Sequence, residues 1–202
     1  MTLKAALTLT AAPAIILAAT PADAHSSTTV FGISVIDASL HPFLGADHLL
    51  TMLAVGVWAA LVSRNIFELL LAPSAFVAAM IIGFQLTIMN LMLPLVEPMI
   101  GFSLIMLGLM ATTAVATPLG LGATIAFVFG IFHGQAHGVE LLSADSGLVE
   151  TIAIIGAFAF STALLHLVGI SVARKLFARQ RWLAWFCGGA VSRFGLFTAE
   201  GL

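Results

Sequence analysis

Long apolar stretches separated by short polar segments run through the chain from residue 42 to its end. There are six, at about 42–62, 67–90, 96–115, 119–141, 149–172 and 182–199. Each is long enough to cross about 30 Å of hydrocarbon at roughly 1.5 Å per residue. A spanning segment must satisfy its backbone internally, and no barrel-like alternation is present, so we predict six transmembrane helices. Pro42 is expected in the first turn of the first helix, where its missing N–H matters least.

A shorter apolar stretch precedes these six. Lys4 is followed by an apolar run from Ala5 to Ala19 and then by the small-residue pattern Ala22-Asp23-Ala24. This order of charge, short apolar core and A-x-A site is typical of a secretory signal peptide over residues 1–24, with an uncleaved signal anchor as the alternative. Cleavage after Ala24 would leave a periplasmic segment at 25–40 and a six-helix domain at 41–202.

Basic residues orient the predicted helices. If the mature N-terminus is periplasmic, the inner loops fall near 63–68, 116–118 and 173–181. These loops hold five of the six basic residues of the mature chain, namely Arg64, Arg174, Lys175, Arg179 and Arg181. This matches the positive-inside rule, so we predict a bacterial inner-membrane protein with both mature termini in the periplasm. Three spans followed by three also allow a 3+3 inverted arrangement, although no sequence repeat supports it.

Composition excludes several classes of protein. Hydrophobic residues make up 61% of the 202 residues and charged residues 8%. Soluble domains carry about a quarter charged residues, so this composition excludes a soluble globular domain. Seven Lys and Arg against nine Asp and Glu leave no basic patch for nucleic acid. The single cysteine excludes a disulfide framework and a cysteine-rich zinc site. No G-x-x-x-x-G-K-[ST] motif is present, so this chain carries no P-loop ATPase of its own.

Polar residues within the first span form one of two clusters. The sequence at 41–48 reads H-P-F-L-G-A-D-H, and helical periodicity places His41, Gly45, His48 and Met52 on one face. A carboxylate such as Asp47 is costly in a span, so it must face protein, water or a cation. On a straight helix His41 and His48 would differ in depth by about 10 Å. We therefore expect either two successive metal stations or a distorted helix start.

The second cluster ends the fourth span, where residues 132–140 read F-H-G-Q-A-H-G-V-E. His133, His137 and Glu140 share a face by their i, i+4, i+7 spacing, and two imidazoles one turn apart can hold one metal ion. A stripe of small residues lies beside them and lets another helix approach closely. We expect the first span to be that helix. The stripe consists of Gly122, Ala126, Gly130, Gly134 and Gly138.

Four further residues are interpreted one by one. His166 in the fifth span is either an interhelical hydrogen-bonding group or a later metal station. Met52 is either plain packing or a soft ligand. After cleavage, His25 would offer its α-amine and imidazole together as a metal chelate. Glu97 is interpreted as a solvated loop charge that mildly attracts cations.

The residue types limit the ion that these clusters would bind. Imidazole with carboxylate suits divalent transition metals, and the absence of thiolate from the clusters argues against a dedicated Cu(I) protein. The types alone do not select one metal, because affinity follows the Irving–Williams order at most such sites. A different class of function remains open, namely a histidine-liganded membrane redox protein with di-iron or haem. Such oxidases need more histidines, generally on the cytoplasmic side.

The two clusters together resemble the HupE/UreJ family. The first matches its H-P-x-x-G-x-D-H-x-x-x-M-x-x-V-G signature, the second matches F-H-G-x-A-H-G-x-E, and the L-H-L-V-G segment at 165–169 is similar too. The resemblance covers essentially the whole mature chain. It implies a nickel or cobalt permease rather than an enzyme, with Ni²⁺ or Co²⁺ as substrate, no cofactor, and a homo-oligomer left open. It also implies ligand roles for His41, Asp47, His48, His133, His137 and Glu140.

Overall fold

The computed structural model describes residues 31–114, 117–142, 146–177 and 189–196. Within these residues all regular structure is helical. The predicted signal peptide at 1–24 and His25 lie outside the described residues. Of the predicted sixth span at 182–199, only the helix at 189–196 is described. The signal peptide and the sixth span therefore stay predictions.

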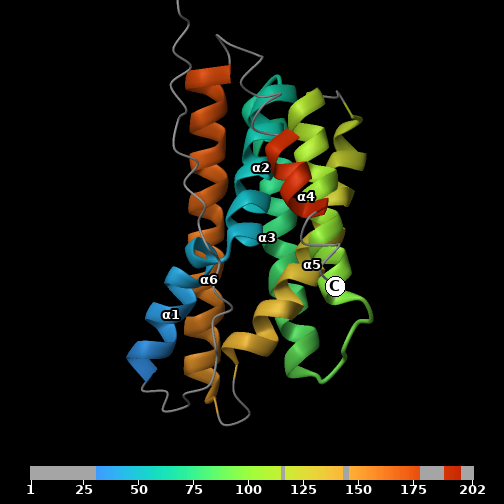
Figure 1. Ribbon diagram of the computed structural model, residues 1–202. Coiled ribbons are helices and arrows are strands. Elements are labelled where there is room, and N and C mark those ends of the chain that lie inside the picture. Colours follow the sequence, from blue (N-terminus) through green and yellow to red (C-terminus); the bar gives the residue numbers. More distant parts are fainter. Residues whose placement is uncertain (1–30, 115–116, 143–145, 178–188, 197–202) are drawn as a thin grey trace, which may run out of the picture.

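Six long helices make up the described part of the bundle, together with the short helix at 189–196 (Figure 1). The ends of α3 to α6 agree with the predicted second to fifth spans to within two residues. Helices α2 to α6 alternate in direction, so the α2–α3 turn and the C-terminal end of α6 lie at one end of the bundle (Figure 1). The helices are α1 (Phe31–Leu44), α2 (Ala46–Val62), α3 (Ile66–Ile88), α4 (Val96–Thr113), α5 (Leu119–Leu141) and α6 (Leu148–Val172), which a π-helical segment, Ala173–Phe177, extends.

The described helices support an all-α membrane protein. Three of them are long and apolar enough to cross a membrane, namely α3, α4 and α6 with its extension. The count rises to four if α1 and α2 form one broken span. Six spans therefore stay a prediction, whereas the all-helical fold is confirmed for the described residues.

The first predicted span differs from the structure. The chain bends by 77° between α1 and α2, so the prediction of one helix over 42–62 is wrong. Pro42 lies in the last turn of α1 rather than in a first turn, where its missing N–H weakens the helix just before the bend. Gly45 is the N-cap of α2 in an extended conformation. A Cβ on Gly45 would lie 3.0 Å from His48 Nδ1 and 3.1 Å from Asp47 Oδ1, so a larger residue would crowd both side chains.

Helix α6 supports both halves of this broken segment. Helix α1 lies along the N-terminal part of α6, where the Ser161 hydroxyl donates a 2.8 Å hydrogen bond to the Ser39 carbonyl. Helix α2 crosses α6 further along, and two glycines make this crossing close. A Cβ on Gly56 would collide with the His166 carbonyl, and one on Gly169 would collide with the Leu53 carbonyl.

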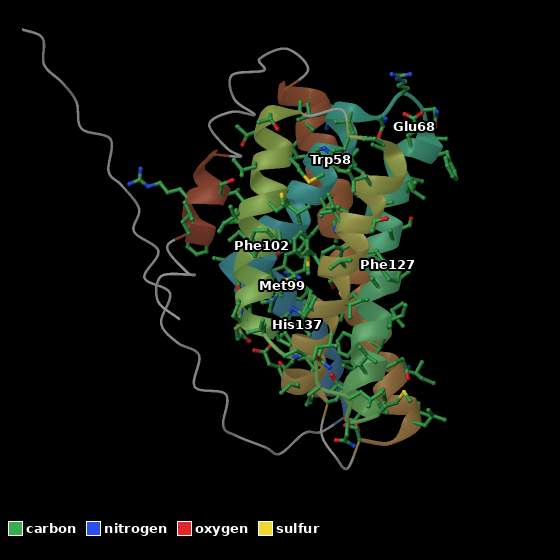
Figure 2. All side chains as sticks on the ribbon, turned by 90° about the vertical axis from the view of Figure 1, so that its right-hand side faces the viewer. Trp58, Glu68, Met99, Phe102, Phe127 and His137 are labelled. Atoms are coloured by element: carbon green, nitrogen blue, oxygen red, sulfur yellow. The ribbon has the colours of Figure 1, made fainter. Side chains whose placement is uncertain are left out.

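The small-residue stripe of α5 packs mainly against α3, its most extensive partner in the bundle. Gly130 faces the backbone of Phe76, and Gly134 faces the backbone of Met80. The sequence predicts the first span as the neighbour, but among the glycines of the stripe only Gly122 meets it, under the ring of Trp58 on α2. A stripe of small residues lets another helix approach closely, but it does not show which helix does so. Figure 2 places Trp58 toward the end of the bundle that carries Glu68, and His137 toward the opposite end.

Replacing Gly134 by alanine should destabilise the bundle, because its Cβ would collide with the backbone of Met80. Overpacking of this kind costs about 1–3 kcal/mol. We expect a lower thermal unfolding midpoint for the detergent-purified protein. Gly156→Ala on α6 is the matched control, since nothing lies within 4 Å of the added Cβ and alanine favours a helix. Equal midpoints for the two variants would contradict the packing argument.

Candidate metal site

The bend at Gly45 brings the two histidines of the first motif together. His41 lies in the last turn of α1, His48 lies in the first turn of α2, and the centres of their rings are 6.4 Å apart. Of the two alternatives predicted from the sequence, the structure contains the distorted helix start. The depth difference expected for a straight helix is therefore absent, and both rings face the same part of the bundle interior.

Helix α5 adds His133 and His137 to the same place. The ring of His137 lies 4.8 Å from that of His41 and 4.1 Å from that of His48, centre to centre. His133 lies 5.3 Å from His48. His133 and His137 are 0% exposed and His48 is 9% exposed. The two motifs, separated by more than 80 residues of sequence, therefore meet in one cluster of four imidazoles.

Each of the three buried imidazoles is held through Nδ1. Nδ1 of His48 bonds Asp47 Oδ1 at 2.9 Å, and Nδ1 of His137 lies 3.2 Å from Glu140 Oε2. Nδ1 of His133 donates to the Phe129 carbonyl at 3.0 Å, since a carbonyl oxygen only accepts. Nε2 of all three rings is buried and has no hydrogen-bond partner in the described structure. Metal-binding histidines show this pattern, with one nitrogen fixed by an oxygen and the other free for the ion.

Glu140 joins the outer edge of the cluster. Its Oε2 lies 2.9 Å from His41 Nε2 as well as 3.2 Å from His137 Nδ1. One ligand atom each from His41, His137 and Glu140 can be chosen so that all lie within 4.8 Å of one another. The Glu140 side chain is 52% exposed and that of His41 is 30% exposed. This group therefore stands where the buried histidines meet the surface.

A cavity of about 620 Å³ opens beside this group. Its wall contains the carboxylates of Asp47, Glu97 and Glu140, together with His41 and His48, and no Lys or Arg among its described lining residues. The interpretation of Glu97 as a loop charge is wrong, because it lies in the first turn of α4 and lines this cavity. A hollow with three carboxylates and no cation attracts positively charged ions.

Gln135 was missed by sequence reasoning, although an amide within a span between two histidines was a signal. The side chain is 1% exposed. Its Nε2 donates to the Leu91 carbonyl and its Oε1 accepts from the Leu93 N–H, both at 2.7 Å. Gln135 thus ties the segment between α3 and α4 to α5. Leu93 lines the cavity, so this link shapes its wall.

The remaining candidates lie outside the cluster. Met52 is 0% exposed and packs in an apolar group with Met80, Phe84 and Phe158, so packing is the role that its contacts support. His166 is buried on α6, and the ring of Phe76 separates it from His133, 5.3 Å from His133 and 5.4 Å from His166. His25 lies outside the described residues.

Comparison with known proteins agrees with these motifs. Residues 13–198 match the family described as HupE / UreJ protein. The chain is 33% identical over 178 residues to Protein HupE of Rhizobium leguminosarum bv. viciae, and the alignment covers 88% of this chain and 90% of that protein. No solved structure matches the chain.

Replacing Gln135 by leucine should release the segment between α3 and α4. It would leave the Leu93 N–H and the Leu91 carbonyl without their partner, at a cost of about 1–3 kcal/mol per buried group. We expect a lower unfolding midpoint in detergent and faster protease cleavage between residues 89 and 95. Gln135→Glu keeps the acceptor for Leu93 but turns a buried carboxylate oxygen toward the Leu91 carbonyl, so it should also lower the midpoint. Cleavage at the parent rate in Gln135→Leu would contradict this role.

Replacing Glu140 by glutamine should weaken binding of Ni²⁺ or Co²⁺ to the purified protein by about 10–100-fold, the usual effect of losing a carboxylate that orients a ligand histidine. Equilibrium dialysis with radiolabelled metal measures this, with Glu150→Gln in the first turn of α6 as the control. Equal affinities for the two variants would exclude Glu140 from the site.

Proposed function

Because the chain belongs to the HupE/UreJ family, we propose that it carries a divalent transition-metal cation, Ni²⁺ or Co²⁺, from the periplasm to the cytoplasm. One observation carries this proposal: three buried imidazoles, each fixed at Nδ1 and free at Nε2, lie beside an acidic cavity. Nitrogen ligands of this kind suit nickel and cobalt, and carboxylates nearby offset their charge.

Capture would begin in the cavity, where Glu97, Asp47 and Glu140 raise the local concentration of cations. His41, His137 and Glu140 then replace part of the hydration shell, because their ligand atoms already lie close together. His48 and His133 receive the ion further in. Asp47 contributes by holding the His48 ring through Nδ1, in addition to any direct contact with the ion.

The direction of transport follows from the positions of the charges. Arg64, in the α2–α3 turn, and Arg174 and Lys175, which follow α6, lie at one end of the bundle (Figure 1). We assign this end to the cytoplasm by the positive-inside rule, which opens the acidic cavity toward the periplasm. An inside-negative potential of 100 mV favours inward movement of a divalent ion by about 4.6 kcal/mol. Facilitated diffusion or secondary transport therefore needs no nucleotide hydrolysis by this chain.

Uptake of radiolabelled Ni²⁺ and Co²⁺ by cells expressing the full chain tests the proposal. We expect uptake above the vector background for the parent, and background levels for His48→Ala and for His133→Ala, because each variant loses a buried free Nε2. Glu150→Gln should transport like the parent, because Glu150 lies in the first turn of α6 and does not line the acidic cavity. Immunoblots of isolated membranes check that all variants are present in equal amounts.

Two results would contradict the proposal. If neither metal enters above background in cells that contain the parent protein, the transport function is wrong. If both histidine variants transport like the parent, the assignment of the cluster is wrong. Iron or haem absorbance in the purified parent would instead favour the redox alternative.

A further inference from the structure

Buried polar atoms without partners are rare in folded proteins because each costs about 1–3 kcal/mol. In the described structure the side-chain atoms of this kind belong to six residues. Three are His48, His133 and His137 of the cluster, and two are the threonines Thr51 and Thr117. The sixth is His166, and it alone leaves two atoms, Nδ1 and Nε2, without a partner. The outer cluster does not account for His166.

The position of His166 is fixed by the helix crossing described above. Its backbone carbonyl lies against Gly56 of α2, so the residue has little freedom to shift. Its side chain is 1% exposed. The ring of Phe76 contacts both His133 and His166, so His166 is the next imidazole beyond the cluster, across one phenyl ring. Six residues, about 9 Å of helix rise, separate it from the end of α6 at the proposed cytoplasmic side.

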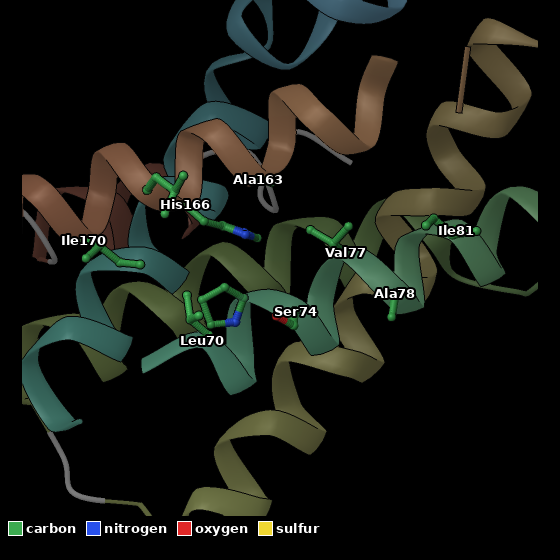
Figure 3. A pocket seen from close by; sticks show the side chains of 10 residues that line it. Leu70, Ser74, Val77, Ala78, Ile81, Ala163, His166 and Ile170 are labelled. Carbon is green, nitrogen blue, oxygen red and sulfur yellow. The ribbon is translucent and has the colours of Figure 1, made fainter. Parts of the chain in front are cut away.

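A second cavity, of about 360 Å³, adjoins His166 between α3 and α6. Figure 3 shows the imidazole directed from α6 toward α3, with Ser74 and Val77 on the opposite wall. Ser74 adds a hydroxyl oxygen, and apart from it and His166 the described lining residues are apolar. The space is large enough for water molecules to accompany an ion at the imidazole.

We propose that His166 is a second binding station for the transported divalent cation, inward of the outer cluster and separated from it by Phe76. The proposal rests on the proposed function, since it names a later position of the same ion. One imidazole, supplemented by water and the Ser74 hydroxyl, binds more weakly than a cluster of imidazoles and carboxylates. A weaker inner station suits release, because conduction needs sites that an ion can leave.

A cysteine at position 166 tests binding directly. In a Cys187→Ser background the chain has no other thiol, and the full-length His166→Cys protein is titrated with Co²⁺ in detergent. We expect a thiolate-to-cobalt charge-transfer band in the near ultraviolet. Phe160→Cys, which is 71% exposed on α6, is the matched control and should show no band. Absence of the band in His166→Cys, or an equal band in Phe160→Cys, overturns the proposal.

Residual Ni²⁺ binding and the rate of uptake supply the second test. His48→Ala/His137→Ala should retain weak Ni²⁺ binding in equilibrium dialysis, and adding His166→Gln should abolish it. His166→Gln alone should lower the maximal uptake rate about tenfold or more, with the half-saturating metal concentration changed less than about twofold. Parent-like uptake together with unchanged residual binding overturns the inner station. If the parent transports no metal, the proposed function fails, and the cobalt band still decides whether His166 binds the ion.

Discussion

Two histidines seven residues apart become neighbours because the chain turns by 77° at Gly45. The turn depends on a small residue, since a Cβ at this position would crowd Asp47 and His48. It also depends on Pro42, whose missing N–H weakens the last turn of α1. The remaining features of the site follow from this bend, because only a broken helix directs His41 and His48 toward the same ring of His137.

Close backbone contacts hold the other half of the site in place. Gly130 and Gly134 seat α5 on α3, and Gly56 and Gly169 seat α2 on α6. At the cavity end of the bundle, imidazole rings of α2 and α5 meet in the space between these two helices. Within that space each buried ring is oriented through Nδ1 by a carboxylate or a carbonyl. Rigid packing and oriented ligands together preorganise the site before an ion arrives.

The same arrangement has an energetic cost that relates stability to function. Each buried, unpaired nitrogen destabilises the empty protein by about 1–3 kcal/mol, and apolar residues in these places would remove that cost. A cation at the free nitrogens would satisfy them. Binding must remain weak enough for the ion to move on, so a few ligands at successive positions suit transport better than one closed coordination sphere.

The sequence by itself determined the helical membrane fold, the ends of α3 to α6 and the residue types of both motifs, because hydropathy and helical period are local properties. It did not determine the bend at Gly45, the pairing of the α5 stripe with α3, or the places of Glu97 and Gln135. These depend on contacts between segments far apart in the chain. Periodicity tells which residues share a face of one helix, and only tertiary packing decides which faces meet.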